Sequence, residues 1–203
     1  MLSNVLSIML LEKMKALDYY IFSKINGQWH NSFFDAFFTL SREAYFWAPF
    51  YLFLALFVIT NFKKTGWLWV LFLILNVFLS DYLSSVVIKE NFYRLRPCRD
   101  PLIADHLRFL VKSCGLNSSF TSSHAVNHFA AAMFIFATFK KNLGNWWGLV
   151  FVWALIPSYA QIYVGVHFPG DIIGGAIAGL IIGYLVAYLF NRTGLENKNA
   201  TDT

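Results

Sequence analysis

Five long apolar runs constrain this chain more than any other feature. They occupy residues 44–60, 67–88, 125–139, 146–163 and 172–190. A helix of about 20 residues crosses the hydrocarbon core of a bilayer, and tilt or flanking polar turns accommodate shorter runs. Only 13% of the residues are charged, against about 25% in a soluble domain. The sequence therefore predicts an all-α, polytopic transmembrane bundle of about five spanning helices.

The segments outside these runs are more polar. Residues 5–20 read as an amphipathic helix and residues 32–40 as a short aromatic one, and we expect both to lie in the membrane interface. A sixth crossing would place Glu12 and Lys13 inside the membrane, which is costly. The sequence thus divides into an N-terminal interfacial segment, a membrane-embedded bundle and a disordered polar tail, at residues 1–43, 44–192 and 193–203.

Three polar clusters lie in the connections between the apolar runs. Because consecutive spans alternate direction, the loop 89–123 and the turn 164–170 should emerge at the same face of the membrane. The first cluster is basic, the second precedes a helix, and the third pairs a histidine with an aspartate four residues later. The alternation of the spans alone places eight residues at the same depth in the membrane: Lys89, Arg94, Arg96, Ser122, Ser123, His124, His167 and Asp171.

Together these side chains describe an anion site. Lysine and arginine supply positive charge, and free backbone N–H groups at a helix start bind phosphate. A histidine bonded to an aspartate is held in one tautomer with its other ring nitrogen free, while a second histidine can exchange a proton. Each cluster alone also has a structural explanation, as a snorkelling basic flank or a helix N-cap. A zinc site is the weaker alternative because the nearby cations oppose it, although ligand types are present in His124, His128, His167 and Asp171.

The same residues carry a resemblance to the type 2 phosphatidic acid phosphatase (PAP2) superfamily, which also includes vanadium haloperoxidases and glucose-6-phosphatase. The family's first block, Lys, six residues, Arg-Pro, is similar to Lys89 through Arg96-Pro97. Its second block, Pro-Ser-Gly-His, reads Thr-Ser-Ser-His at 121–124. Its third block, Ser-Arg, five residues, His, three residues, Asp, reads Ala-Gln before His167 and Asp171. The resemblance covers residues 67–189.

The resemblance implies a membrane phosphatase that works through a phosphohistidine intermediate and needs no cofactor and no metal. His167 is then the nucleophile, Asp171 orients it, and His124 gives a proton to the leaving oxygen. The groups that would hold the phosphoryl oxygens are Lys89, Arg96 and the backbone amides at Ser122 and Ser123.

Two departures from the family pattern affect this site. Gln161 stands where the family has a phosphate-binding arginine, so a charge-assisted contact of about 1.5–3 kcal/mol is missing. Arg94, or another loop cation such as Arg99, is expected to compensate. Ser123 replaces a glycine and is expected to need a backbone conformation that glycine adopts readily. The departures leave open a rival from another class, a weakened relative that binds or moves a phospholipid without efficient turnover.

Two observations bear on the membrane face that carries the site. The two cysteines, Cys98 and Cys114, lie in the loop 89–123, where they form a disulfide or remain free thiols. A disulfide implies an oxidising compartment. Basic residues at 63–64, 140–141 and 192 close the spans at the other face. Both observations favour a bacterial inner-membrane protein with an extracytoplasmic site.

A site at the membrane surface predicts a lipid phosphate as substrate, with the bilayer as its other partner. Relatives act on undecaprenyl diphosphate, phosphatidylglycerophosphate, phosphatidate or lipid A phosphates, and the undecaprenyl carrier is our first expectation. The formal charge of +5 suits anionic head groups. The basic residues flank membrane helices or the site, so the sequence predicts no nucleic-acid binding.

Overall fold

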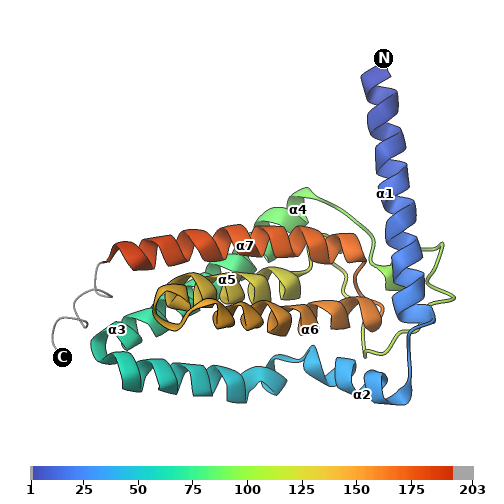
Figure 1. The fold of residues 1–203 in the computed structure, drawn as a ribbon. Helices are drawn as coiled ribbons and strands as arrows, with labels where there is room; N and C mark the ends of the chain where they lie inside the picture. Colours follow the sequence, from blue (N-terminus) through green and yellow to red (C-terminus); the bar gives the residue numbers. More distant parts are fainter. Residues whose placement is uncertain (1, 194–203) are drawn as a thin grey trace.

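The computed structural model describes residues 2–193, and over that range it confirms the expectation of a chain built from helices alone (Figure 1). Its long helices are α1 (Leu2–Gly27), α2 (Ser32–Ser41), α3 (Ala48–Tyr82), α5 (Ser123–Leu143), α6 (Leu149–Tyr163) and α7 (Pro169–Arg192). Its short elements are η1 (Ala44–Trp47), η2 (Leu83–Ile88), α4 (Lys89–Asn91), η3 (Pro97–Arg99) and η4 (Asn145–Gly148). The tail expected from residue 193 lies, from residue 194 on, outside the described residues.

The first two apolar runs form a helical hairpin inside α3. Lys63 has φ 49° and ψ −121°, which interrupts the helix, and the chain doubles back there (Figure 1). The two arms, residues 48–62 and 64–82, touch closely at the turn. A Cβ atom on Gly66 would lie 2.3 Å from the carbonyl oxygen of Val58. Glycine is therefore required at position 66 for the arms to meet.

Helix α5 is the centre of the bundle and packs most extensively against α7. Small residues make this contact possible, because a Cβ on Gly179 would lie 2.4 Å from the Val126 carbonyl oxygen. One on Gly183 would lie 2.2 Å from that of Ala130. Such close backbone approach is typical of helix packing in membranes. It holds the N-terminal ends of α5 and α7 side by side.

Two stretches of the described chain are long and apolar enough to cross a membrane, Ala44–Asn91 and Pro169–Arg192. The first includes both arms of α3. The five crossings expected from the sequence remain a prediction.

The N-terminal segment is longer and better anchored than the sequence predicts. Helix α1 continues seven residues beyond the expected end at residue 20 and projects from one end of the bundle (Figure 1). Its first half exposes a series of apolar side chains, whereas Phe22 and Ile25 are buried. Asn26 anchors the C-terminal half, because its Nδ2 donates to the carbonyl oxygen of Tyr163 at 2.8 Å. The second half of α1 is therefore part of the folded bundle.

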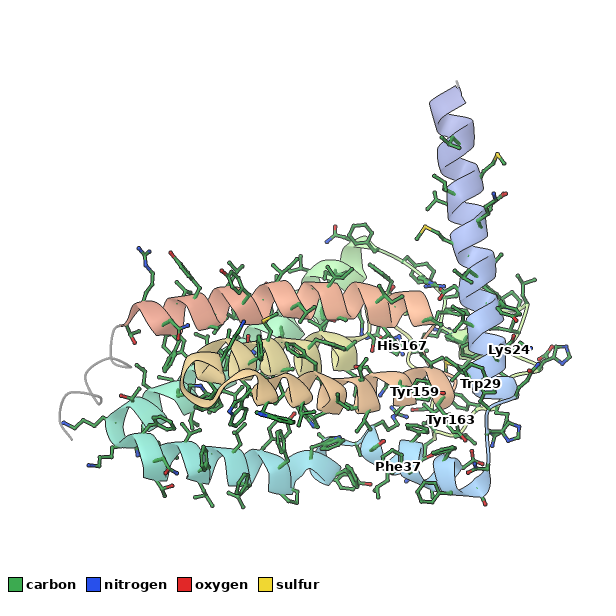
Figure 2. The ribbon with its side chains drawn as sticks, viewed as in Figure 1. Lys24, Trp29, Phe37, Tyr159, Tyr163 and His167 are labelled. Atoms are coloured by element: carbon green, nitrogen blue, oxygen red, sulfur yellow. A yellow bond between two sulfur atoms is a disulfide. The ribbon has the colours of Figure 1, made fainter. Side chains whose placement is uncertain are left out.

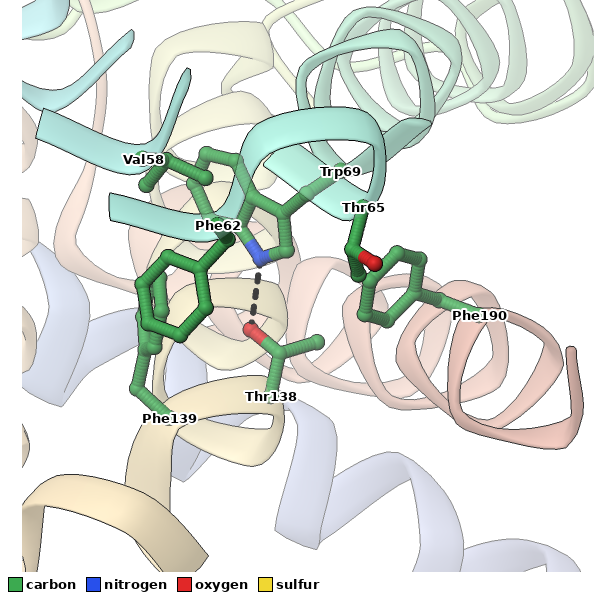
Figure 3. Close-up of a pocket in the computed structure, with 7 residues that line it drawn as sticks. All are labelled: Val58, Phe62, Thr65, Trp69, Thr138, Phe139 and Phe190. Atoms are coloured by element: carbon green, nitrogen blue, oxygen red, sulfur yellow. Dashed lines mark hydrogen bonds between the residues drawn. The ribbon is translucent and has the colours of Figure 1, made fainter. Parts of the chain in front are cut away.

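The end of the bundle opposite α1 is closed by aromatic packing around the α3 turn. Trp69 Nε1 donates to Thr138 Oγ1 at 2.8 Å, between rings from α3, α5 and α7 (Figure 3). This contact fixes the turn of the hairpin against α5. The motif residues lie at the other end of the bundle, next to α1.

Candidate active site

The structure brings His167 and Asp171 together at the α1 end of the bundle. His167 lies in the turn between α6 and α7 (Figure 2), and Asp171 is in the first turn of α7. The His167 Nδ1 is 3.4 Å from Asp171 Oδ2. That oxygen also accepts hydrogen bonds from the backbone N–H of Phe168 at 2.9 Å and from Ser119 Oγ at 2.5 Å. The carboxylate is fully buried and fixed from three sides.

The second ring nitrogen of His167 faces the loop 89–123. Its Nε2 lies 3.2 Å from Arg96 Nη1. With the proton on Nδ1 beside the carboxylate, Nε2 carries a free lone pair directed at a cation. An anion drawn to Arg96 would therefore meet this lone pair. Arg96 itself is held by Asn117, whose Oδ1 accepts from Arg96 Nη2 at 2.8 Å.

The environment of His167 keeps its ring uncharged. Burial lowers its pKa from 6.5 to about 4, and the nearby charges of Arg96 and Lys89 act in the same direction. Asp171 opposes this shift without reversing it. A neutral imidazole is the nucleophilic form. The ring is thus in its reactive state at neutral pH.

Lys89 and the start of α5 form a second cluster beside the first. Lys89 Nζ donates to Ser123 Oγ at 2.8 Å. The π-helical segment η2 adds two further hydroxyl groups, because Ser84 and Ser85 lie 3.0 and 3.2 Å from the same oxygen. Ser122 caps α5 by accepting from the backbone N–H of Ala125 at 3.5 Å. The cluster places the Lys89 ammonium group beside the N-terminus of α5, and both attract an anion.

The expectation that Ser123 needs a glycine-like backbone is wrong. Among the described residues other than glycine, Lys63 alone has a positive φ. Ser123 is the first residue of α5 and has an ordinary helical conformation. Its side chain is instead used to contact Lys89.

The expectation that Arg94 compensates for Gln161 does not fit the structure. Its Nη1 lies 2.8 Å from Asp171 Oδ1, its Nη2 contacts Asp18 Oδ2, and its guanidinium lies 4.2 Å from the Phe168 ring centroid. Two carboxylates already neutralise this cation, so it supports Asp171 from behind. Arg99 is exposed and donates to the carbonyl oxygen of Leu116 at 3.2 Å.

Gln161 lies next to His167 but supplies no charge. Its backbone oxygen accepts from the His167 N–H at 3.2 Å, so the end of α6 shapes the histidine turn. The side chain is buried, and its Nε2 has no hydrogen-bond partner within residues 2–193.

The loop 89–123 is closed by a disulfide between Cys98 and Cys114. The contact between Arg96 and Asn117 lies just outside the segment that the bond closes, since each of these two residues lies within three positions of a cysteine. A Cβ on Gly115 would lie 3.1 Å from Arg96 Cζ, so the closed loop wraps the guanidinium. The disulfide therefore holds the cation that faces His167.

Sequence reasoning missed three residues of this site. Ser119 contacts Asp171, Asn117 holds Arg96, and Asp18 Oδ1 accepts from the backbone N–H of Gly170 at 2.7 Å. The two loop residues belong to no family block. Asp18 lies 152 positions before Gly170, and no spacing rule relates positions so far apart.

A cavity of about 800 Å³ runs from the second cluster between the arms of α3. The polar residues that line it are Arg42, Asp81, Ser123, His124, Asn127 and His128. Most of the remaining wall is apolar and includes Leu52, Ala55, Val70, Leu73, Ile74, Val77 and Phe78. The cavity has a charged end and a long hydrophobic part, so its shape matches an amphiphile.

The chain belongs to the PAP2 superfamily, because the family's model matches residues 69–195. It is 30% identical over 151 residues to a lipid A 4'-phosphatase of Bacteroides thetaiotaomicron, a match over 72% of this chain and 65% of the relative. It is 36% identical over 104 residues to a lipid A 4'-phosphatase of Porphyromonas gingivalis, covering 50% of this chain and 42% of the relative. The matches thus span less than two thirds of either relative.

Two solved structures have a similar fold. Aquifex aeolicus LpxE aligns with a TM-score of 0.61 and 28% identity, over 85% of this chain and 95% of that one. A PAP2-type phosphatidylglycerolphosphate phosphatase of Bacillus subtilis, described as transmembrane, aligns with a TM-score of 0.64 and 21% identity. That alignment covers 89% of this chain and 87% of the neighbour, and shows the fold alone. The apolar helices and these relatives make the chain an integral membrane protein.

Proposed function

We propose that the protein is a metal-independent phosphatase that hydrolyses the phosphate ester or diphosphate of a membrane lipid. The position of His167 between Asp171 and Arg96 carries this proposal, since one nitrogen faces a fixed carboxylate and the other faces a cation. The amphiphilic cavity that ends at His124 supports a lipid as the substrate.

In the proposed reaction, Nε2 of His167 attacks phosphorus and the bond to the leaving oxygen breaks. Asp171 stabilises the imidazolium that forms, and His124 gives a proton to the leaving alkoxide or phosphate. Water, deprotonated by His124, then attacks the phosphohistidine, breaks the nitrogen–phosphorus bond and releases inorganic phosphate. The negative charge that develops on the phosphoryl oxygens is balanced by Lys89, Arg96 and the amides at the start of α5.

Among lipid phosphates, we infer a lipid A-type glycolipid as the first candidate. Both curated relatives are named lipid A 4'-phosphatases, and the solved LpxE structure is 28% identical. This choice replaces the undecaprenyl carrier as the first substrate to test. The rival, a weakened lipid-binding protein, is not favoured, because both curated relatives are named as phosphatases.

We also propose that the site faces the extracytoplasmic side of a bacterial inner membrane. The disulfide of the loop supports an oxidising compartment, and the basic residues Lys63, Lys64 and Arg192 lie toward the opposite end. A membrane-impermeant maleimide should label Leu102→Cys in intact spheroplasts and should not label Lys64→Cys. The reverse pattern would invert the orientation.

A phosphate-release panel on detergent-solubilised protein tests the activity. The substrates are a lipid A phosphate, undecaprenyl diphosphate, phosphatidylglycerophosphate and phosphatidate. We expect release from at least one lipid by the wild type and at least about 1000-fold less from His167→Ala. Thermal unfolding should show that this variant is folded. Binding without release by the wild type would favour the lipid-binding rival.

A further inference from the structure

We propose that Arg42 binds the substrate phosphoryl group and supplies the positive charge that Gln161 lacks. This inference rests on the proposed function. Its basis is the arrangement of Arg42 at the polar end of the cavity, beside His124 and Ser123. Arg42 lies outside residues 69–195, the region that matches the family's model.

The backbone of Arg42 is held in place from both sides. Arg42 ends α2, and its N–H donates to the carbonyl oxygen of Leu40. The next turn is closed by Trp47 Nε1, which donates to the carbonyl oxygen of Ser41 at 2.7 Å. Helix α2 itself packs on α6 through Phe38, whose ring lies 4.7 Å from that of Tyr163. Arg42 thus projects from a rigid support.

The Arg42 side chain has one buried donor, its Nε, without a hydrogen-bond partner among residues 2–193. Glu43 Oε1 is 3.7 Å from that nitrogen, which is near enough for attraction and too far for a hydrogen bond. A buried N–H without a hydrogen-bond partner is unfavourable, and a ligand oxygen would supply that partner. The paired N–H groups of a guanidinium bind phosphate oxygens through two parallel hydrogen bonds.

Two other arginines of this end are already paired with carboxylates. Arg94 pairs with two carboxylates, and Arg108 Nη2 pairs with Asp35 Oδ2 at 2.6 Å. Arg96 is held by Asn117 and faces His167. Burial lowers the pKa of Arg96, Asp171 opposes this, and the positive charge of Arg42 adds to the lowering. The charge of Arg42 therefore lies near enough to affect Arg96, while its Nε keeps no hydrogen-bond partner in the described chain.

Gln161 and Arg42 together take the place of the family's phosphate-binding arginine. The backbone of Gln161 contacts the His167 N–H, and its side-chain Nε2 has no partner among residues 2–193. Arg42 supplies positive charge from the cavity side. A phosphoryl group on His167 would lie between α5 and the turn after α6, within the field of both. The family's single contact is thereby replaced by two residues from separate helices.

Kinetics of Arg42 variants test the inference. We expect Arg42→Ala to lower kcat/KM for the best lipid phosphate by about 10–100-fold, the loss of one charge-assisted contact. Arg42→Lys should recover part of the lost activity, because lysine restores the positive charge but not the paired N–H groups of a guanidinium. Inorganic phosphate, used as a competitive inhibitor, should bind Arg42→Ala at least about tenfold more weakly. Adding Gln161→Arg to Arg42→Ala should restore activity toward the wild type.

Arg99→Ala is the matched control, because it removes the same charge from an exposed side chain at the same membrane face. If Arg42→Ala unfolds, Arg42→Gln takes its place. A variant within twofold of the wild type, or an equal loss in Arg99→Ala, would overturn the role of Arg42. Failure of the wild type to release phosphate from any lipid would instead overturn the proposed function.

Discussion

Replacing Arg94 by methionine should disable His167 indirectly, by freeing its supporting carboxylate. Methionine preserves an apolar stem over the Phe168 ring and removes the charge that joins Asp18 to Asp171. Asp171 is fully buried, and Arg94 is the hydrogen-bond donor to its Oδ1 within the described residues. The substitution therefore leaves a buried carboxylate oxygen without its partner.

The expected loss of stability follows from the contacts. Breaking a buried ion pair costs about 3–5 kcal/mol. The Arg94 side chain is 27% exposed, so solvent screening favours the lower end, about 3 kcal/mol. For a chain of this size, each kcal/mol lowers Tm by about 2–4 °C. We therefore expect Tm to fall by about 6–12 °C and kcat by about 10–100-fold, as His167 loses its orientation.

Thermal unfolding in detergent and steady-state kinetics measure both effects. Arg192→Met is the control, because it removes an exposed arginine that lies over Tyr188, far from the site. A double-mutant cycle with Asp18→Asn should show coupling of about 0.5–3 kcal/mol. A raised KM with unchanged Tm and kcat would refute the reasoning, because that pattern belongs to a phosphate-binding Arg94.

Three further predictions concern the ring, the loop and the cavity. Because the His167 pKa is lowered to about 4, the ring gains its proton only at low pH. The acid limb of the kcat/KM profile should thus fall near pH 4, and a limb near pH 6.5 would contradict this assignment. Titration should find no free thiol before reduction, and reduction of the Cys98–Cys114 bond should destabilise the protein by about 3 kcal/mol in unfolding experiments. Ile74→Trp should narrow the cavity and lower turnover of long-chain lipid phosphates more than that of a short-chain analogue. Equal effects on both substrates would show that the lipid tail does not occupy the cavity.

The sequence predicted the helical class and the gathering of Lys89, Arg96, Ser123, His167 and Asp171 at one end of the bundle, because both follow from local patterns. The catalytic role of His124 stays a prediction. Apolar runs identify helices, and alternating spans place connections on one face. The hairpin inside α3 has its turn where Lys63 and Lys64 separate the two apolar runs. By contrast, the conformation of Ser123 depends on where α5 begins. The family motif, which has glycine at this position, does not reveal that conformation.

The partners of Arg94 could not be found from the sequence, since they depend on tertiary contacts. A loop arginine near two motif cations looks like a phosphate ligand. Its true neighbours are Asp171 and Asp18, which lie 77 and 76 positions away. Ser119 and Asn117 were missed for the same reason, because neither belongs to a motif and each joins the site through folding alone.

The docking of α1 has a consequence for how much of this chain a minimal enzyme must contain. A fragment limited to residues 69–195 would retain all three motif blocks. It would nonetheless lack Asp18, so the N–H of Gly170 and one side of Arg94 would lose their acceptor. The shortest autonomous unit therefore begins upstream of the family boundary, within the second half of the first helix.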